Sequence, residues 1–169
     1  MKAIESFTLE WLSDYSEYGI ALVALLAFAE SCFGIGLFVS GALLLVVSAS
    51  LYNNGIADLV TLLPLAFLGA LLGDHAGYAI GRRLGPRLHQ LSLARKYEVQ
   101  LRRAESLILR FGTAAIFIGR FVPAIRSLIP AMVGISGFGR WRYTLLDALA
   151  CLAWALALGL ILVGIDELF

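Results

Sequence analysis

The stretch Gly119–Pro130, which reads GRFVPAIRSLIP, decides how this sequence folds. It carries two arginines, Arg120 and Arg126, and two prolines, Pro123 and Pro130, between apolar flanks that read TAAIFI and AMVGISG. An arginine among apolar residues at membrane depth is costly, and a proline inside a helix removes a backbone hydrogen bond. The stretch therefore predicts an interrupted helix. Interrupted backbone at membrane depth has to be buried in protein or line a cavity.

The composition is that of an integral membrane protein. Of the 169 residues, 60% are hydrophobic and the mean hydropathy is +0.88, whereas soluble domains are about 45–50% apolar. A chain of this length is expected to form a single domain, 1–169. The N-terminal segment has acidic residues where a secretory signal has a basic start and an apolar core, so it is expected to be mature protein. Cys32 and Cys151 lie in apolar runs without metal-ligand spacing and are expected to be buried.

Working outward from the opening stretch, four long apolar segments can be recognised, at 19–52, 59–81, 111–139 and 143–165. A membrane-spanning helix needs about 20 residues, so the second and fourth segments fit one span each. The first and third are too long for one span and too short for two, and each has a polar interruption near its middle. Each of these two segments is therefore either a tilted span or a hairpin.

The distribution of basic residues favours hairpins. Ten of the 13 lysines and arginines lie on the connections 82–110 and 140–142, which flank the third segment. Basic connections stay in the cytoplasm, so both ends of the third segment are expected there. The flanks of the first segment are acidic or neutral, so both of its ends are expected outside.

An amphipathic stretch precedes each hairpin. Such stretches form helices in the membrane interface or ordinary helices packed on the spans. Their apolar positions are Ile4, Phe7, Trp11, Tyr15 and Tyr18 in the first, and Tyr97, Leu101, Ala104, Ile108 and Phe111 in the second. The sequence thus predicts an all-α polytopic membrane protein built from two inverted repeats, about 1–87 and 88–169. Each repeat would have an amphipathic helix, a re-entrant helical hairpin and a transmembrane helix, as in many transporters.

The second segment also carries a stripe of glycines four residues apart, which predicts that another helix backbone packs closely along it. The stripe consists of Gly69, Gly73, Gly77, Gly81 and Gly85.

Ionisable residues inside the apolar segments are the candidate functional residues. They are Glu30, Asp74, Arg120, Arg126 and, nearer a segment end, Asp147. Two arginines at a helix break make a planar, always charged fork for a phosphate, and Glu30 and Asp74 would balance their charge. The alternative is a salt-bridge cluster that only pins the two hairpins together, although desolvation offsets most of the gain from such a cluster.

Enzymatic chemistry has little support. The sequence has no P-loop and no serine–histidine–acid arrangement, and His75 and His89 have no metal-ligand companions. His75, beside Asp74, could relay protons, although a hydrogen-bonded interior histidine is the commoner case. We expect no enzyme activity, metal, cofactor or nucleic-acid partner.

Four pieces of the sequence carry a family resemblance. They are FAES with Glu30, GDHAGYAIGRRLG from Gly73, FGTAAIFIGRFVPAIRSLIPAMVGISG from Phe111, and Trp154 with Gly159. With them the chain resembles the DedA family of membrane proteins, also called the VTT or SNARE-associated family. The resemblance implies two re-entrant hairpins in an inverted repeat, and a role as a lipid translocase. Bacterial members are implicated in returning undecaprenyl phosphate to the cytoplasmic face, some driven by protons or sodium, and eukaryotic relatives scramble phospholipids.

The resemblance places the family's functional arginines at Arg120 and Arg126, and its first-hairpin acid at Glu30. Many members have a proline–glycine–acid turn where this chain has Ser40-Gly41-Ala42. The second acid of the first hairpin is thus absent, and Asp74 is expected to replace it in part.

The expected function is transport of a phosphate-bearing lipid such as undecaprenyl phosphate across the bacterial cytoplasmic (inner) membrane, coupled to protons or sodium. The protein could form a homo-oligomer. A proton-coupled exporter of small cations or drugs, using the same acids, and a non-transporting membrane scaffold are the alternatives.

Overall fold

The computed structural model describes residues 16–39, 41–85, 87, 96–123 and 125–166, and every regular element among them is helical. In chain order these elements are α2 (Ser16–Ser31), the 3₁₀ helix η1 (Ile35–Leu37), α3 (Gly41–Asn53), α4 (Leu59–Leu84), α6 (Glu98–Phe111), α7 (Ala114–Arg120), α8 (Ile129–Ile135) and α9 (Arg140–Asp166).

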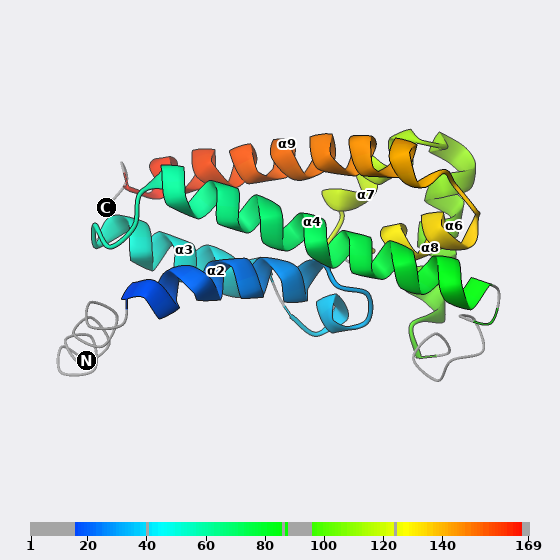
Figure 1. The fold of residues 1–169 in the computed structure, drawn as a ribbon, viewed down its shortest axis with the longest axis horizontal. Helices are drawn as coiled ribbons and strands as arrows, with labels where there is room; N and C mark the ends of the chain where they lie inside the picture. Colours follow the sequence, from blue (N-terminus) through cyan, green and yellow to red (C-terminus); the bar gives the residue numbers. More distant parts are fainter. Residues whose placement is uncertain (1–15, 40, 86, 88–95, 124, 167–169) are drawn as a thin grey trace.

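The two long helices α4 and α9 form the frame of the molecule. Both are apolar and long enough to cross a membrane, with windows of mean hydropathy 1.6 and 2.5, and they correspond to the second and fourth predicted segments. They run antiparallel along the long axis (Figure 1). The end of α4, with Arg82 and Arg83, therefore lies at the same end of the molecule as the start of α9, with Arg140 and Arg142. We call this end the basic end.

The first and third apolar segments are both broken helices, as the sequence predicts. In the first, α2 and α3 are separated by residues 32–40, and in the third, α7 and α8 are separated by residues 121–128. Figure 1 shows α2 and α3 extending from the end opposite the basic end, whereas α7 and α8 lie toward the basic end. The two breaks meet near the middle, where Gly36 packs against Ser127. Re-entry of these hairpins into a bilayer remains a prediction.

The two prolines of the opening stretch have different places in this break. Pro123 lies within the non-helical turn, whereas Pro130 lies in the first turn of α8. In the first turn a missing backbone N–H costs no helical hydrogen bond. The interruption is therefore centred on residues 121–128 and ends before Pro130.

The glycine stripe of α4 packs against two helices in turn. A Cβ on Gly69 would overlap the carbonyl oxygen of Ala24 in α2, and a Cβ on Gly81 would overlap that of Ala131 in α8. Gly73 faces α2 in the same way, with the Phe28 carbonyl oxygen against it, whereas Gly77 has looser contacts with Pro130 of α8 and with Phe33. The stripe thus holds both hairpins on one helix. Gly85 has open space around it and ends α4 with a φ of +52°, so its role is the helix end and not the packing.

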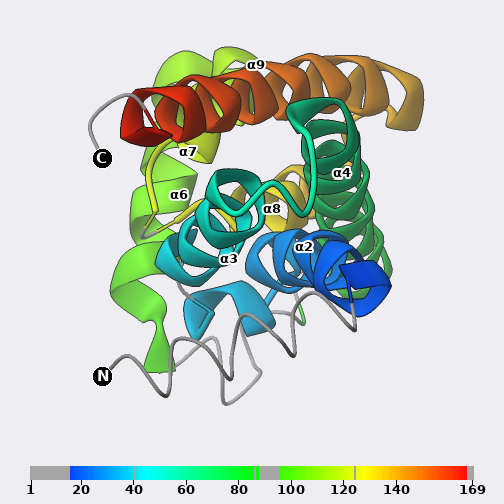
Figure 2. The same cartoon turned by 90° about the vertical axis from the view of Figure 1, so that its left-hand side faces the viewer.

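The second amphipathic stretch forms α6, which crosses the basic end (Figures 1 and 2). Leu101 and Ala104 are buried, and Ile108 packs against the same core, whereas Phe111 at the helix end is exposed. The first stretch lies outside the described residues apart from Tyr18, which is exposed. Both cysteines are buried and free, as predicted.

Candidate functional site

Both arginines of the opening stretch are buried at the meeting point of the two hairpins. Arg120 is the last residue of α7 and Arg126 lies in the turn before α8, and their exposed fractions are 5% and 6%. The close crossing of α7 and α8 depends on Gly119, because a Cβ there would overlap the side chain of Ile129. Local sequence thus sets where the arginines lie, at the inner end of a short hairpin.

Arg126 pairs with the first hairpin. Its Nη1 donates to Glu30 in the last turn of α2, and its Nη2 donates to the hydroxyl of Ser31 at 2.9 Å. Gly41 at the start of α3 makes room for this pair, because a Cβ at Gly41 would overlap the Glu30 carboxylate. The pair joins the two broken helices across the middle of the molecule.

Arg120 pairs with the two long helices instead. Its Nη1 donates to Asp74 on α4 and lies 4.0 Å from Oδ1 of Asp147 on α9. Asp74 and Asp147 are both almost fully buried. Each arginine therefore has a different acid, and all four predicted site residues, Glu30, Asp74, Arg120 and Arg126, lie in one cluster.

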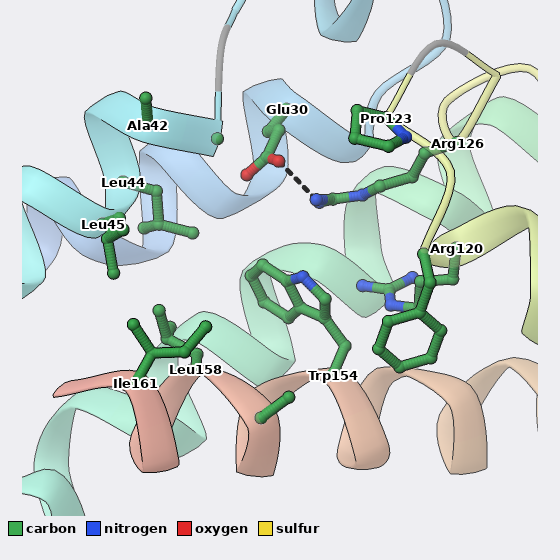
Figure 3. A pocket seen from close by; sticks show the side chains of 13 residues that line it. Glu30, Ala42, Leu44, Leu45, Arg120, Pro123, Arg126, Trp154, Leu158 and Ile161 are labelled. Atoms are coloured by element: carbon green, nitrogen blue, oxygen red, sulfur yellow. Dashed lines mark hydrogen bonds and ion pairs between the residues drawn. The ribbon is translucent and has the colours of Figure 1, made fainter. Parts of the chain in front are cut away.

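Trp154 on α9 contacts both guanidinium groups. The Cζ atoms of Arg126 and Arg120 lie 4.7 Å and 5.3 Å from the centre of its rings, which is within the range of a cation–π interaction. Figure 3 shows the indole projecting from α9 toward the two arginines. From the sequence alone, Trp154 stands out only as one of the residues that carry the family resemblance. The signal for its role is a lone tryptophan within the otherwise small and aliphatic run CLAWALALG.

The ion pairs leave part of each guanidinium without a partner. Among the described side chains, the N–H groups at Nε of Arg126 and at Nε and Nη2 of Arg120 are buried and have no hydrogen-bond acceptor. A buried donor without an acceptor is costly, and more so when it is charged. These N–H groups are available to an anion, which would compete with the paired acids for the same two guanidinium groups.

A cavity of about 380 Å³ opens beside these groups. Glu30, Arg120, Arg126 and Trp154 line one end of it, and Figure 3 shows aliphatic side chains at the other. The aliphatic residues are Leu44 and Leu45 of α3 and Leu158 and Ile161 of α9. The cavity is thus charged at one end and apolar at the other.

A second cavity of about 280 Å³ also borders the Glu30–Arg126 pair. It shares Glu30, Gly41, Pro123 and Arg126 with the first. The rest of its lining comes from the turn of the first hairpin, at Gly36, Leu37, Phe38 and Val39. The Glu30–Arg126 ion pair therefore lines both cavities.

The model of the VTT domain matches residues 22–163, which is most of the chain. The chain belongs to the VTT-domain family. This confirms the resemblance that the sequence pieces carry.

Relatives of this VTT-domain protein include three inner membrane proteins of Escherichia coli. YqjA of Escherichia coli K12 is 29% identical over 161 residues, which are 94% of this chain and 73% of YqjA. YabI and YghB of the same strain are 26% and 31% identical over 85% and 69% of this chain. The chain spans 57% of the length of YabI and 54% of YghB. No solved structure matches it.

The VTT-domain protein is thus an integral membrane protein, and we assign it to the bacterial inner membrane, as its relatives are. Its two apolar helices of spanning length agree with this assignment.

One further group of side chains lies behind Arg120, away from the cavity. Asp74, Asp147 and Cys151 place their ligand atoms within 4.8 Å of one another, and the Cys151 thiol lies 3.7 Å from Asp74. Because Asp74 already accepts a hydrogen bond from Arg120, a guanidinium occupies the place a metal ion would take. The part played by Cys151 was not evident from the sequence, where the thiol reads only as a small apolar residue.

His75 joins this group from α4. One ring nitrogen, Nδ1, lies 2.9 Å from the Leu71 carbonyl oxygen and 3.4 Å from Oδ2 of Asp147. The other, Nε2, lies 3.0 Å from the Thr144 hydroxyl. The ring is thus hydrogen-bonded and also lies next to a buried acid, so the structure is compatible with both sequence interpretations. His89 lies outside the described residues.

Proposed function

We propose that this VTT-domain protein moves a phosphate-bearing lipid between the two leaflets of the membrane, with Arg120 and Arg126 as the phosphate ligands. The observation that carries the proposal is the cavity with two buried, partly unpartnered guanidinium groups at one end and aliphatic walls at the other. A phosphate has several acceptor oxygens and a charge that arginine matches with a planar fork.

The shape of the cavity suits the head of a lipid. Ligand pockets typically measure about 300–1,000 Å³, so about 380 Å³ accommodates a phosphate with the first part of an apolar chain. Leu158 and Ile161 lie one to two helical turns beyond Trp154, on the side of α9 away from the basic end. The rest of a long chain would lie in the bilayer.

Because the aliphatic end of the cavity points away from the basic end, it can be assigned to one side of the membrane. Basic connections stay in the cytoplasm, so the basic end is the proposed cytoplasmic end. The aliphatic part of the cavity then faces the outer half of the membrane, and the two hairpins re-enter from opposite sides as inverted repeats. This arrangement suits uptake of a lipid phosphate from the outer leaflet. Undecaprenyl phosphate, which the family resemblance suggests, is our proposed substrate.

Glu30 and Asp74 hold the arginines when the site is empty. A phosphate competes with both acids, so part of its binding energy is used to separate them from Arg126 and Arg120. Such competition links lipid binding to the charge state of the acids, and it provides a route to coupling with protons or sodium. An exporter of cations is less favoured, because Asp74 does not line the cavity and Glu30 is already paired.

Reconstitution into liposomes tests the proposal. A fluorescent polyprenyl phosphate is placed in both leaflets, and the fraction that an impermeant quencher reaches is followed in vesicles with and without the protein. The matched control is the same polyprenol without its phosphate. We expect protein-dependent movement of the phosphate lipid only. Equal movement of both lipids, or movement of neither, would refute a phosphate-specific transporter.

A further inference from the structure

Among the described residues, the cluster behind Arg120 holds two buried carboxylates against one guanidinium. Asp74 and Asp147 have exposed fractions of 1% and 2%, and Arg120 is the guanidinium that contacts both. Arg126 does not supply the missing charge, because Glu30 already balances it. One oxygen of each carboxylate, Oδ1 of Asp74 and Oδ2 of Asp147, accepts no hydrogen bond from the described residues. A buried carboxylate without compensation is strongly disfavoured.

His75 lies where a compensating proton could arrive. Its Nδ1 is 3.4 Å from the unpartnered Oδ2 of Asp147, and its side chain is 30% exposed whereas that of Asp147 is 3% exposed. His75 lies seven residues before Arg82 on α4, which is about 10 Å along a helix. Its partner Thr144 lies close to Arg142 at the start of α9. The imidazole therefore sits between the buried acids and the basic end.

We propose that Asp74, Asp147 and His75 form a proton-binding site behind Arg120, separate from the lipid cavity and linked to it through that arginine; the inference rests on the proposed function. A lipid phosphate that draws Arg120 away leaves two facing carboxylates. Neutral His75 then takes up a proton at Nε2 from water at the basic end and becomes an imidazolium. The N–H bond at Nδ1 breaks and an O–H bond forms on Asp147, so His75 is neutral again, the net change is one proton bound, and no electrons move.

Arg120 connects the two sites. Of the charged residues in this cluster, Arg120 lines the lipid cavity, whereas Asp74, Asp147 and His75 do not. The same guanidinium donates to Asp74 and lies 4.0 Å from Asp147. Phosphate and the acid pair therefore compete for one side chain, and a proton on the acids weakens their hold on it. Lipid binding and proton binding favour each other, as linkage requires.

The surroundings suit a proton better than a sodium ion. Hard cations take several oxygen ligands, but this cluster places a thiol, a guanidinium and an imidazole around the carboxylates. The titratable and charged groups that face the acid pair are Arg120 from α7, Arg126 from the turn before α8, Tyr143 and Cys151 from α9, His75 from α4 and Cys32 after α2.

Proton uptake on lipid binding tests the inference. The full chain in detergent is titrated with dodecyl phosphate in buffers of the same pH but different ionisation enthalpy, and the calorimetric difference gives the protons bound per lipid. Because the probe titrates equally in every experiment, differences between variants report on the protein. We expect Asp147→Asn to bind about one proton fewer than the wild type. The matched control is Asp58→Asn, an exposed carboxylate at the start of the same α4, which should leave the number unchanged.

His75→Gln provides a second test if Asp147→Asn does not fold. Its side chain is partly exposed, so the replacement is milder, and stopped-flow proton uptake with a pH dye should be at least tenfold slower than in the wild type. Unchanged proton counts in Asp147→Asn, or unchanged uptake rates in His75→Gln, would overturn the proton site while lipid binding stands. Affinity that follows sodium concentration with no proton uptake would overturn it in favour of sodium. A wild type that does not bind dodecyl phosphate would refute the proposed function itself.

Discussion

Replacing Arg126 by lysine separates a phosphate ligand from a structural ion pair. The arginine donates to Glu30 and Ser31, keeps Nε free, and stacks on Trp154. Lysine retains one positive charge beside Glu30 but loses the planar fork. A hydrogen bond to a charged group contributes about 1.5–3 kcal/mol. Loss of one such bond to phosphate corresponds to binding that is roughly 10- to 140-fold weaker.

Alanine at the same position has a second effect. Arg126→Ala leaves the Glu30 carboxylate buried without a partner, and breaking a buried pair in this way costs about 3–5 kcal/mol. Misfolding and lost binding then look alike. Adding Glu30→Gln removes the orphaned charge, so the double variant should regain much of its thermal stability. It should not regain phosphate binding, because the ligand is still missing.

The assay scores folding and binding separately. Thermal unfolding in detergent gives stability, calorimetry with dodecyl phosphate gives affinity, and transport in liposomes is expressed per folded molecule. We expect Arg126→Lys to be folded and to bind the probe weakly, and we expect the double variant to be folded and inactive. Wild-type affinity in Arg126→Lys, or recovered transport in Arg126→Ala with Glu30→Gln, would show that Arg126 is a structural residue and would refute the phosphate site.

Two further predictions concern packing and topology. Gly81→Ala should lower the free energy of unfolding by about 1–3 kcal/mol, and with it the unfolding temperature, because the added methyl group would overlap the backbone of Ala131. The control is Gly164→Ala in α9, which has open space around it and should be neutral or stabilising. Equal effects of the two substitutions would contradict the packing role of Gly81. The topology is tested with single cysteines in a chain from which Cys32 and Cys151 have been removed. A cysteine at position 17 or 54 should react with an impermeant thiol reagent from outside, whereas one at position 98 should react only after permeabilisation. Labelling of positions 17 and 54 from opposite sides would rule out a re-entrant first hairpin.

The helix pattern could be predicted from sequence because its causes are local. The lengths of the apolar segments separate α4 and α9 from the broken helices, and Pro123 between two arginines marks the break before α8. The glycine stripe likewise predicts a close helix contact. The sequence does not predict that two different helices, α2 and α8, pack on this stripe, because their contact residues Ala24 and Ala131 lie far apart in the chain.

The pairing within the site could not be predicted in the same way. Glu30 and Arg126 are 96 positions apart, and Asp74 and Arg120 are 46 apart. A sequence shows that buried acids and bases need partners, but not which acid meets which base. Trp154 was missed for a related reason, because an aromatic residue in an apolar helix usually contacts lipid or core. Its role depends on α9 lying across the end of a hairpin formed by α7 and α8.

Asp74 and the carboxylate that is absent from the first hairpin differ in position but not in charge. Ala42 lines the cavity, at the place where the family resemblance expects a carboxylate. Asp74 does not line it, but lies on the other side of Arg120 and shares that guanidinium with Asp147. Asp74 therefore does not take the place of the absent carboxylate in the cavity wall. It can still replace it in charge, because an acid that holds Arg120 from behind competes with a phosphate as directly as one that faces it. Without a carboxylate at Ala42, the apolar wall continues up to the arginines, which leaves Glu30 as the acid that a lipid phosphate meets in the described part of the cavity.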